Sequence, residues 1–430
     1  MLPVEGPPIA GGAVCVRDGW IVDVGVLADV RGRNVEARVM DLGEAILAPG
    51  LVDAHAHLEW SLMDGVLPSQ TFASWLGRLL GLRGRMEPED HLVAARYGAV
   101  RALRAGTTTL ADSGPTGAAV IAMAEAGLRG PVHLEAFGRE EGEEARALAA
   151  GVAERVAALA AAADPRNRVG LSPHAPYTVG PGLWAALAEV PDLARGPWAT
   201  HLAESDDEAR VIAGGDGELA EVFSTIGAVP GRWPGAEGAG PVERLAGAGA
   251  LRRGLVAAHC VQLSDGDPAL LAQAGVGVAH CPRSNEHLHC GRAPLEALGE
   301  AGVHVGLGTD SPASGGDYDV RAEARACARI HGEAAAQPEA LLGLATIGGA
   351  RVLGLDGEVG SLAPGKRADL VALRTGPSSP RDPWAAALAA DTEVTTVVID
   401  GAVALAEGRP TGIDAGEVET AAIRARRRLW

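Results

Sequence analysis

The chain has 430 residues, of which 47% are hydrophobic and 3% aromatic, and its formal net charge is −18. This acidic excess argues against nucleic acid or an anionic membrane as the main partner. No apolar stretch reaches the ~18 residues that a transmembrane helix needs, and the N-terminus lacks the basic and apolar regions of a signal peptide. Five cysteines without a Cys-x-x-Cys pair fit a reducing compartment, so we expect a cytoplasmic protein with neither a nucleic-acid nor a membrane partner.

Both ends of the chain have the pattern of small antiparallel sheets. Within residues 13–25, two β-rich runs flank an Asp-Gly dipeptide, which is typical of a tight hairpin turn. A second Asp-Gly follows the β-rich run 394–399. We therefore expect residues 1–48 and 358–409 to form one small composite β-sandwich, with a helical segment over residues 410–430.

The middle of the chain, residues 49–357, alternates short apolar runs with Ala-, Leu- and Glu-rich helical patterns. The expected helices include residues 88–105, 142–163 and 338–353. The eight expected strands are residues 51–55, 107–112, 131–136, 169–173, 197–202, 255–260, 276–281 and 303–309. Eight such units favour an α/β fold, a parallel (β/α)8 TIM barrel, over an open sheet. Residues 214–241 are rich in Gly and Pro and predict a loop or lid at the rim.

Two histidines, His55 and His57, close the first expected strand. Side chains alternate along a strand, so these two point the same way, about 6–7 Å apart along the backbone. Two converging imidazoles are half of a divalent-metal site. The alternative is a half-buried strand with two polar residues on its wet face.

Other polar residues end other expected strands: His174 the fourth, His201 the fifth, His259 the sixth and Asp310 the eighth. In a parallel barrel the C-terminal strand ends face the active site. Imidazole and carboxylate suit a borderline ion that activates water. The predicted ligands of one divalent ion, Zn²⁺ or Fe²⁺, are His55, His57, His201 and Asp310.

Glu204 lies three residues after His201 and can fold back over the metal pocket. A carboxylic acid there can protonate a ring nitrogen and a leaving amine. Asp310 can also accept the proton of the water, and His259 can orient the water. For Glu204 the alternative is an acid in the first turn of a helix, a role that residues 206–208 can fill. For His259 it is a strand-end histidine with satisfied hydrogen bonds.

Together these motifs resemble the amidohydrolase superfamily, and in particular its mononuclear deaminase/chlorohydrolase branch. The resemblance spans nearly the whole chain, including the turn over residues 364–371. That branch includes adenosine-type, S-adenosylhomocysteine, guanine and aminodeoxyfutalosine deaminases and triazine hydrolases. The motifs are His55-x-His57, His174-Ala-Pro-Tyr177, His201-x-x-Glu204, His259 and Gly308-Thr309-Asp310-Ser311.

Two sequence features bear on the number of metal ions. The two-metal form of this barrel chemistry commonly needs a carboxylated lysine on the fourth strand. The one lysine of the chain, Lys366, lies in a turn of the terminal sandwich, so we expect a mononuclear site. A second cluster, formed by His280, His287, His289 and Cys290, fits no ligand set by its spacing, and we expect rim or substrate contacts there.

Within the branch, residues 57–61, 72–76 and 281–285 are similar to aminodeoxyfutalosine deaminases of the futalosine route to menaquinone. Scarce aromatic residues gather near the expected mouth, which suits a planar base, although Phe72 and Trp75 could equally be helix core. The resemblance and this pattern predict a small purine-like substrate. Its expected contacts are His174, Trp60, Glu59, Tyr177, Ser284, Asn285 and Ser311.

We therefore expect an aminohydrolase acting on C–N bonds of cyclic amidines. Its first candidate substrate is 6-amino-6-deoxyfutalosine. The alternatives are a deaminase of S-adenosylhomocysteine, adenosine or guanine, and a triazine-type chlorohydrolase. A non-catalytic scaffold on this fold would require missing ligands, and none is missing. The family also suggests a homodimer.

Overall fold

The computed structural model describes residues 1–332 and 337–430, and its centre is an eight-stranded parallel barrel. Neighbouring strands pair in chain order, and the last meets the first: the N–H of Asp310 donates to the carbonyl of His55 at 3.0 Å, and that of His57 to the carbonyl of Asp310 at 2.8 Å. The expected (β/α)8 barrel is confirmed. Its strands are β4 (Leu51–Ala56), β5 (Thr107–Gly114), β6 (Gly130–Ala136), β7 (Asn167–Pro173), β8 (Trp198–Leu202), β9 (Leu255–His259), β10 (Gly277–His280) and β11 (Val305–Leu307).

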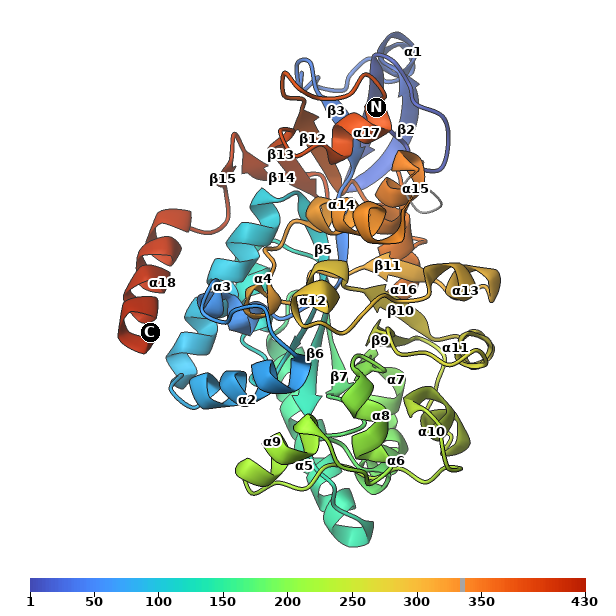
Figure 1. The fold of residues 1–430 in the computed structure, drawn as a ribbon. Coiled ribbons are helices and arrows are strands. Elements are labelled where there is room, and N and C mark those ends of the chain that lie inside the picture. Colours follow the sequence, from blue (N-terminus) through green and yellow to red (C-terminus); the bar gives the residue numbers. More distant parts are fainter. Residues whose placement is uncertain (333–336) are drawn as a thin grey trace.

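Helices surround this barrel (Figure 1). The longest, α5 (Gly142–Ala162) and α3 (Pro88–Arg104), lie where the sequence predicts them. The others in the barrel region are α2 (Phe72–Arg83), α4 (Ala119–Ala126), α6 (Pro181–Glu189), α7 (Pro191–Arg195), α8 (Asp206–Ile212), α9 (Glu218–Thr225), α10 (Pro241–Gly247), α11 (Asp267–Ala274), α12 (Pro282–His287), α13 (Leu295–Glu300) and α14 (Val320–His331). A 3₁₀ turn, Leu58–Met63, follows β4, and another, Pro312–Ser314, follows Ser311.

The helix expected over residues 338–353 is divided. It consists of α15 (Pro338–Gly343), a π-helical turn (Leu344–Gly348) and α16 (Gly349–Val352). After this turn, the backbone at Gly349 approaches β11 closely. The space is so small that a Cβ added at Gly306 would lie only 2.5 Å from the Cα of Gly349. Apolar periodicity does not reveal such an insertion, since the flanking residues keep a helical spacing.

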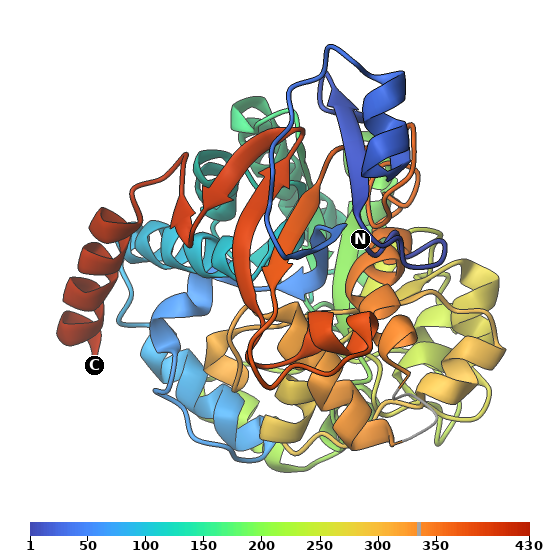
Figure 2. The same ribbon diagram turned by 90° about the horizontal axis from the view of Figure 1, so that it is seen from above.

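Strands from both termini pack together beyond one end of the barrel (Figure 2). A five-stranded antiparallel sheet joins an N-terminal strand to C-terminal ones, and Ile21 of the separate N-terminal hairpin packs against Leu370 of this sheet. The expected β-sandwich from both termini is confirmed. Its elements are β1 (Gly12–Arg17), β2 (Trp20–Val26), α1 (Leu27–Arg33), β3 (Ile46–Pro49), β12 (Leu370–Arg374), α17 (Pro383–Leu388), β13 (Glu393–Ile399), β14 (Ala402–Ala406) and β15 (Arg409–Pro410).

Both expected hairpins have the predicted turns. Asp18 and Gly19 have φ of 51° and 82°, and Asp400 and Gly401 have 50° and 75°. Two successive residues with positive φ match the twist of the flanking strands, and Asp-Gly adopts this conformation at low cost.

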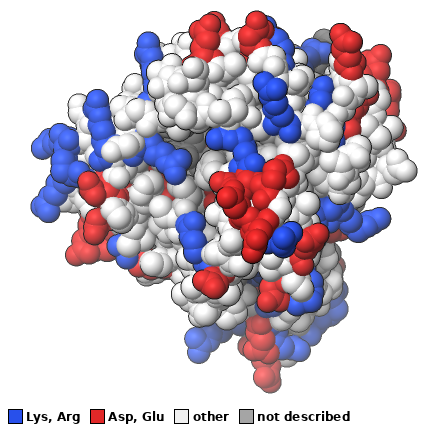
Figure 3. All heavy atoms as spheres, turned by 90° about the horizontal axis from the view of Figure 1, so that it is seen from below, with Lys and Arg blue, Asp and Glu red and all other residues white. Residues whose placement is uncertain are grey.

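The two remaining segments each contain a helix. Residues 214–241 include α9, so the expected loop is partly a helix. The C-terminal helix α18 (Ala415–Leu429) packs beside α3 through Ala422, Ala425 and Leu429 (Figure 1). Within the described ranges, the structure contains no helix long and apolar enough to cross a membrane. Figure 3 shows the molecule from below, relative to the view of Figure 1. On this face acidic and basic side chains are interspersed, and a group of acidic side chains lies near its centre.

Candidate active site

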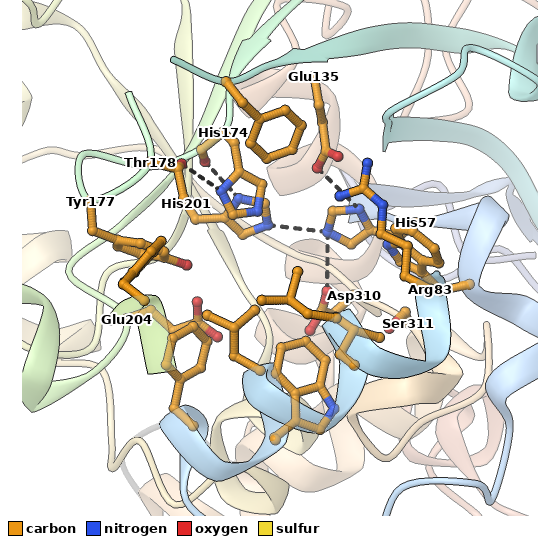
Figure 4. Close-up of a pocket in the computed structure, with 18 of the residues that line it drawn as sticks. His57, Arg83, Glu135, His174, Tyr177, Thr178, His201, Glu204, Asp310 and Ser311 are labelled. Atoms are coloured by element: carbon orange, nitrogen blue, oxygen red, sulfur yellow. Dashed lines mark hydrogen bonds and ion pairs between the residues drawn. The ribbon is translucent and has the colours of Figure 1, made fainter. Parts of the chain in front are cut away.

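Three histidines, His55, His57 and His201, and one aspartate, Asp310, converge at the C-terminal ends of the barrel strands. Figure 4 labels His57, His201 and Asp310. Nε2 of His57 lies 3.1 Å from Nε2 of His201 and 3.3 Å from Oδ1 of Asp310. Nε2 of His55 lies 3.7 Å from the same oxygen of Asp310. All four side chains are buried. The structure thus brings together the four residues that the sequence predicts as metal ligands.

The chemistry of these donors fits a divalent cation. Nε2 of His55 is buried and has no hydrogen-bond partner among the described residues. Burial, with neighbouring histidines, holds the pKa of His55 well below its ordinary value and lowers that of His201 to about 3. Both rings are therefore neutral near pH 7 and keep a lone pair for a metal. Close-set imidazoles and a carboxylate suit Zn²⁺ or Fe²⁺.

Backbone carbonyls orient two of these rings. Nδ1 of His57 donates to the carbonyl of Ser113 at 2.6 Å, and Nδ1 of His201 donates to the carbonyl of His174 at 2.7 Å. A proton held on Nδ1 leaves the lone pair on Nε2, which faces the centre of the cluster. The outer contacts therefore select the tautomer that metal binding needs.

Asp310 is oriented in the same way. Its Oδ2 accepts hydrogen bonds from the hydroxyls of Ser284 and Ser314, both at 2.6 Å, so Oδ1 faces the imidazoles. Burial opposes ionisation, but His57, His259 and the two hydroxyls hold the pKa of Asp310 below its ordinary value. The carboxylate can therefore serve as a ligand and as a proton acceptor.

Glu204 and His259 lie beside the cluster, and a ring nitrogen of His259 is within 4.8 Å of the donor atoms of His55 and Asp310. Oε1 of Glu204 is 3.6 Å from Nε2 of His259, and both side chains are buried. Burial, with the charge of Asp310, raises the pKa of Glu204 well above its ordinary value. Glu204 therefore retains its proton to higher pH than an exposed glutamate and can act as an acid.

The backbone is strained at the strand ends that carry these groups. Ala203, His259 and Asp310 have φ of 52°, 73° and 56°, in the left-handed region that non-glycine residues rarely adopt. Each follows or ends a barrel strand. Such strain persists where the surrounding structure fixes it, and it is concentrated at functional sites.

A cavity of about 320 Å³ opens above the cluster (Figure 4). Glu204, His259 and Asp310 line its floor. Its walls are largely aromatic and aliphatic, and two arginines and one further acid also face it. The wall residues include Trp60, Phe72, Trp75, Phe137, Tyr177, Phe223, Leu76, Leu79, Arg83, Arg139 and Glu135.

Four of the predicted substrate contacts line this cavity: Trp60, His174, Tyr177 and Ser311. Phe72 and Trp75 line it too, so they are not only helix core. The sequence did not predict that Arg83, Glu135 and Arg139 line the cavity. Glu135 is the second-last residue of β6 and Arg139 lies three residues after that strand, however, so the rule that strand ends face the site could have found both.

Three predicted contacts lie elsewhere. Ser284 and Asn285 are not among the lining residues but contact Asp310 and His259 from behind. Glu59 is fully buried: its carboxylate accepts the N–H groups of residues 116–118 and lies 2.9 Å from Nδ1 of His91. It is turned away from the cavity because the chain enters a 3₁₀ turn directly after His57.

Known proteins share this sequence and architecture. Residues 46–404 match the model of the Amidohydrolase family. A 5-methylthioadenosine/S-adenosylhomocysteine deaminase from Moorella thermoacetica is 32% identical, over 97% of this chain and 95% of its own length. The deaminase of the same name from Desulforudis audaxviator is 33% identical, over 100% and 97%.

Solved structures of deaminases share the fold of this chain. An adenosine deaminase from Xanthomonas campestris with bound zinc superposes with a TM-score of 0.85 at 28% identity, covering 99% of this chain and 96% of that one. The aminofutalosine deaminase from Helicobacter pylori shares the fold with a TM-score of 0.78 at 21% identity, covering 92% and 95%. The predicted class, a hydrolase of C–N bonds in cyclic amidines, is confirmed. By its motifs, its fold and this match over most of its length, the chain belongs to the amidohydrolase family.

Proposed function

We propose that the chain is a metal-dependent deaminase of a purine nucleoside with an extended 5′ substituent. The observation that carries this proposal is the placement of Glu204, His259 and Asp310 around one cluster of imidazoles, at the floor of an aromatic cavity. Relatives that match the chain over nearly its whole length are named as deaminases of 5-methylthioadenosine and S-adenosylhomocysteine. We therefore place S-adenosylhomocysteine, one of these two compounds, first among the candidate substrates.

The residues around the cluster can divide the proton transfers among them. A divalent ion held by His55, His57, His201 and Asp310 would make a water molecule acidic enough to attack near neutral pH. Asp310 accepts the proton that this water loses, and His259 orients the water through the lone pair on its Nε2. Glu204 donates its proton to the ring nitrogen next to the attacked carbon. The amine then takes up a proton from these groups and leaves as ammonia.

The walls of the cavity suit the rest of such a substrate. Trp60, Phe72 and Tyr177 present aromatic surface to a planar base. Arg83 and Arg139 are only partly buried and can pair with a carboxylate at the far end of the substrate. S-adenosylhomocysteine carries such a carboxylate, whereas 5′-methylthioadenosine and adenosine do not.

A second candidate substrate is 6-amino-6-deoxyfutalosine. The sequence around Trp60 favours it, and so does the density of aromatic side chains in the cavity, because this compound carries an aromatic ring beyond its ribose. That ring also bears a carboxylate, so the arginines are compatible with both candidates. The menaquinone route thus remains part of the proposal. The chlorohydrolase alternative shares the same floor residues and differs in the leaving group.

Steady-state kinetics on a substrate panel tests the proposal. The panel contains S-adenosylhomocysteine, 5′-methylthioadenosine, 6-amino-6-deoxyfutalosine, adenosine, guanine and a chlorotriazine. We expect the highest kcat/KM for one of the two nucleosides that carry a carboxylate. Arg139→Ala should lower kcat/KM for that compound by about tenfold to a hundredfold and leave 5′-methylthioadenosine nearly unaffected. Turnover of the chlorotriazine alone would overturn the deaminase proposal.

A further inference from the structure

A second group of metal-ligating side chains lies outside the cavity, between strand β10 and helix α14. His280 ends β10, and Cys327 and His331 belong to α14. One donor atom of each lies within 4.8 Å of the donors of the other two. Nε2 of His280 is 3.2 Å from Nε2 of His331. None of the three lines the active-site cavity.

The local structure explains this convergence. Cys327 and His331 are four residues apart on one helix, so they share a face. On β10, Ala279 packs with Ala54, Ala199 and Val256 of other barrel strands, whereas His280 contacts His331 of α14. Alternation along the strand then directs His280 outward, toward the helices. His280 is therefore not the rim residue that the sequence predicts.

Two distances in this group match those of the active-site pair His57 and His201, although the rings of His280 and His331 cross at 74° whereas those of the active-site pair are stacked at 3°. His57 and His201 have their Nε2 atoms 3.1 Å apart and their ring centroids 5.2 Å apart. For His280 and His331 the values are 3.2 Å and 5.2 Å. Two nitrogen ligands at 2.0–2.1 Å from a tetrahedral zinc ion lie about 3.3 Å from one another. Both pairs are therefore spaced as the ligands of one ion.

The surroundings allow an ion to enter and be held. His280 and Cys327 are buried, whereas His331 is partly exposed and gives access from solvent. Burial lowers the pKa of His280 to about 3, so its ring is a neutral donor near pH 7. Burial lowers the pKa of His331, Arg292 lowers it further and Glu296 partly offsets them, so this ring too is a neutral donor near pH 7.

We propose that His280, Cys327 and His331 form a second metal site, which binds one borderline divalent cation such as Zn²⁺ with a fourth position open to solvent beside His331. Two imidazoles and a thiolate are ligands that Zn²⁺ prefers, and binding displaces the thiol proton of Cys327 to solvent. The ion links α14, through Cys327 and His331, to β10, through His280. Helix α12 follows β10 directly and carries Ser284 and Asn285, which hold Asp310 and His259.

The competing arrangement is a plain N–H···N hydrogen bond between two neutral imidazoles, with no ion. Cobalt separates the two, because a cysteine thiolate bound to Co²⁺ gives a near-ultraviolet charge-transfer band that histidine and carboxylate ligands do not give. The experiment uses tag-free, full-length protein loaded with Co²⁺ or Zn²⁺, with metal measured by elemental analysis. The variants are His331→Ala, Cys327→Ala and, as a matched control in the terminal sandwich, Cys15→Ala.

We expect about two ions per chain in the wild type and in Cys15→Ala, both with the thiolate–cobalt band. His331→Ala and Cys327→Ala should each hold about one ion and lose the band. His331 is partly exposed, so its replacement tests the site even if Cys327→Ala fails to fold. Conversely, His57→Ala should lose the active-site ion and keep the band. The proposal is overturned if cobalt-loaded wild type shows no such band, or if His331→Ala binds as much metal as the wild type.

Discussion

Nδ1 of His259 lies 2.9 Å from Oδ1 of Asn285, and this contact fixes the tautomer of a buried imidazole. The ring donates its Nδ1 proton to Asn285 and keeps a lone pair on Nε2, which faces Glu204 at 3.6 Å. Burial also lowers the pKa of His259, so the ring stays neutral near pH 7. Asn285 is thus a positioning residue, which acts on the reaction through His259.

Asn285→Ala should lower kcat by about tenfold to a hundredfold, because His259 can then rotate or change tautomer. KM and metal content should change little, since Asn285 is not among the cavity-lining residues. Glu286→Ala is the matched control, because its exposed side chain pairs with Arg329 on the neighbouring helix. Equal kcat in Asn285→Ala and the wild type would contradict the positioning role.

Glu204→Gln should bind metal normally and lose turnover by about 10²–10⁴-fold, because the amide cannot transfer a proton. The control is Asp206→Asn, which alters an exposed acid in the next helix. Turnover and metal content are measured on the same preparations. If Glu204 only favours the helix dipole, both variants will retain comparable activity.

Removal of the metal with a chelator should abolish turnover, and Zn²⁺ or Fe²⁺ should restore it. The reason is that the buried imidazoles of His55, His57 and His201 offer lone pairs but no group that can attack the substrate. Melting temperature should also fall, because an ion that binds only the folded chain stabilises it. Full activity at a metal content near zero would refute metal dependence.

Stability should fall as the pH is lowered from about 6.5 toward 4, in part because of His133. Burial lowers the pKa of this imidazole to about 4, against an ordinary value of 6.5. Between these values the unfolded chain binds a proton that the folded chain does not. The free energy of unfolding should therefore drop by about 1.4 kcal/mol per pH unit from this group.

Urea unfolding of His133→Gln at both ends of this range measures that contribution. The variant should show a shallower pH dependence than the wild type. His304→Gln, at an exposed imidazole, should keep the wild-type slope. Parallel slopes for His133→Gln and the wild type would show that His133 titrates at its ordinary pKa.

The barrel and the centre of the site could be predicted because both depend on local signals. Strands such as β4, β8 and β9 contain short apolar runs, and functional side chains lie at or near the ends of these runs. Since parallel strands end at one face, residues as distant as His55 and Asp310 could be placed together from the sequence. The Asp-Gly turns at Asp18 and Asp400 were equally local.

The positions of the other site residues depend on tertiary packing and could not be predicted from the sequence. Glu59 follows His57 closely in sequence, but a 3₁₀ turn directs it into the protein. Asn285 matters through a contact with His259, twenty-six residues earlier in the chain. Arg83 reaches the cavity from α2, whose position no local pattern specifies. Substrate choice depends on such loop and helix residues, so it is the least predictable part of the site.

The most direct test of the account is ammonia release by metal-loaded protein given S-adenosylhomocysteine, 5′-methylthioadenosine or 6-amino-6-deoxyfutalosine, with Glu204→Gln measured in parallel. The account predicts one ammonia for each adenine ring converted to its 6-oxo form with at least one of these substrates, and loss of that release in Glu204→Gln. Absence of ammonia from all three, or equal release by the variant, would contradict it.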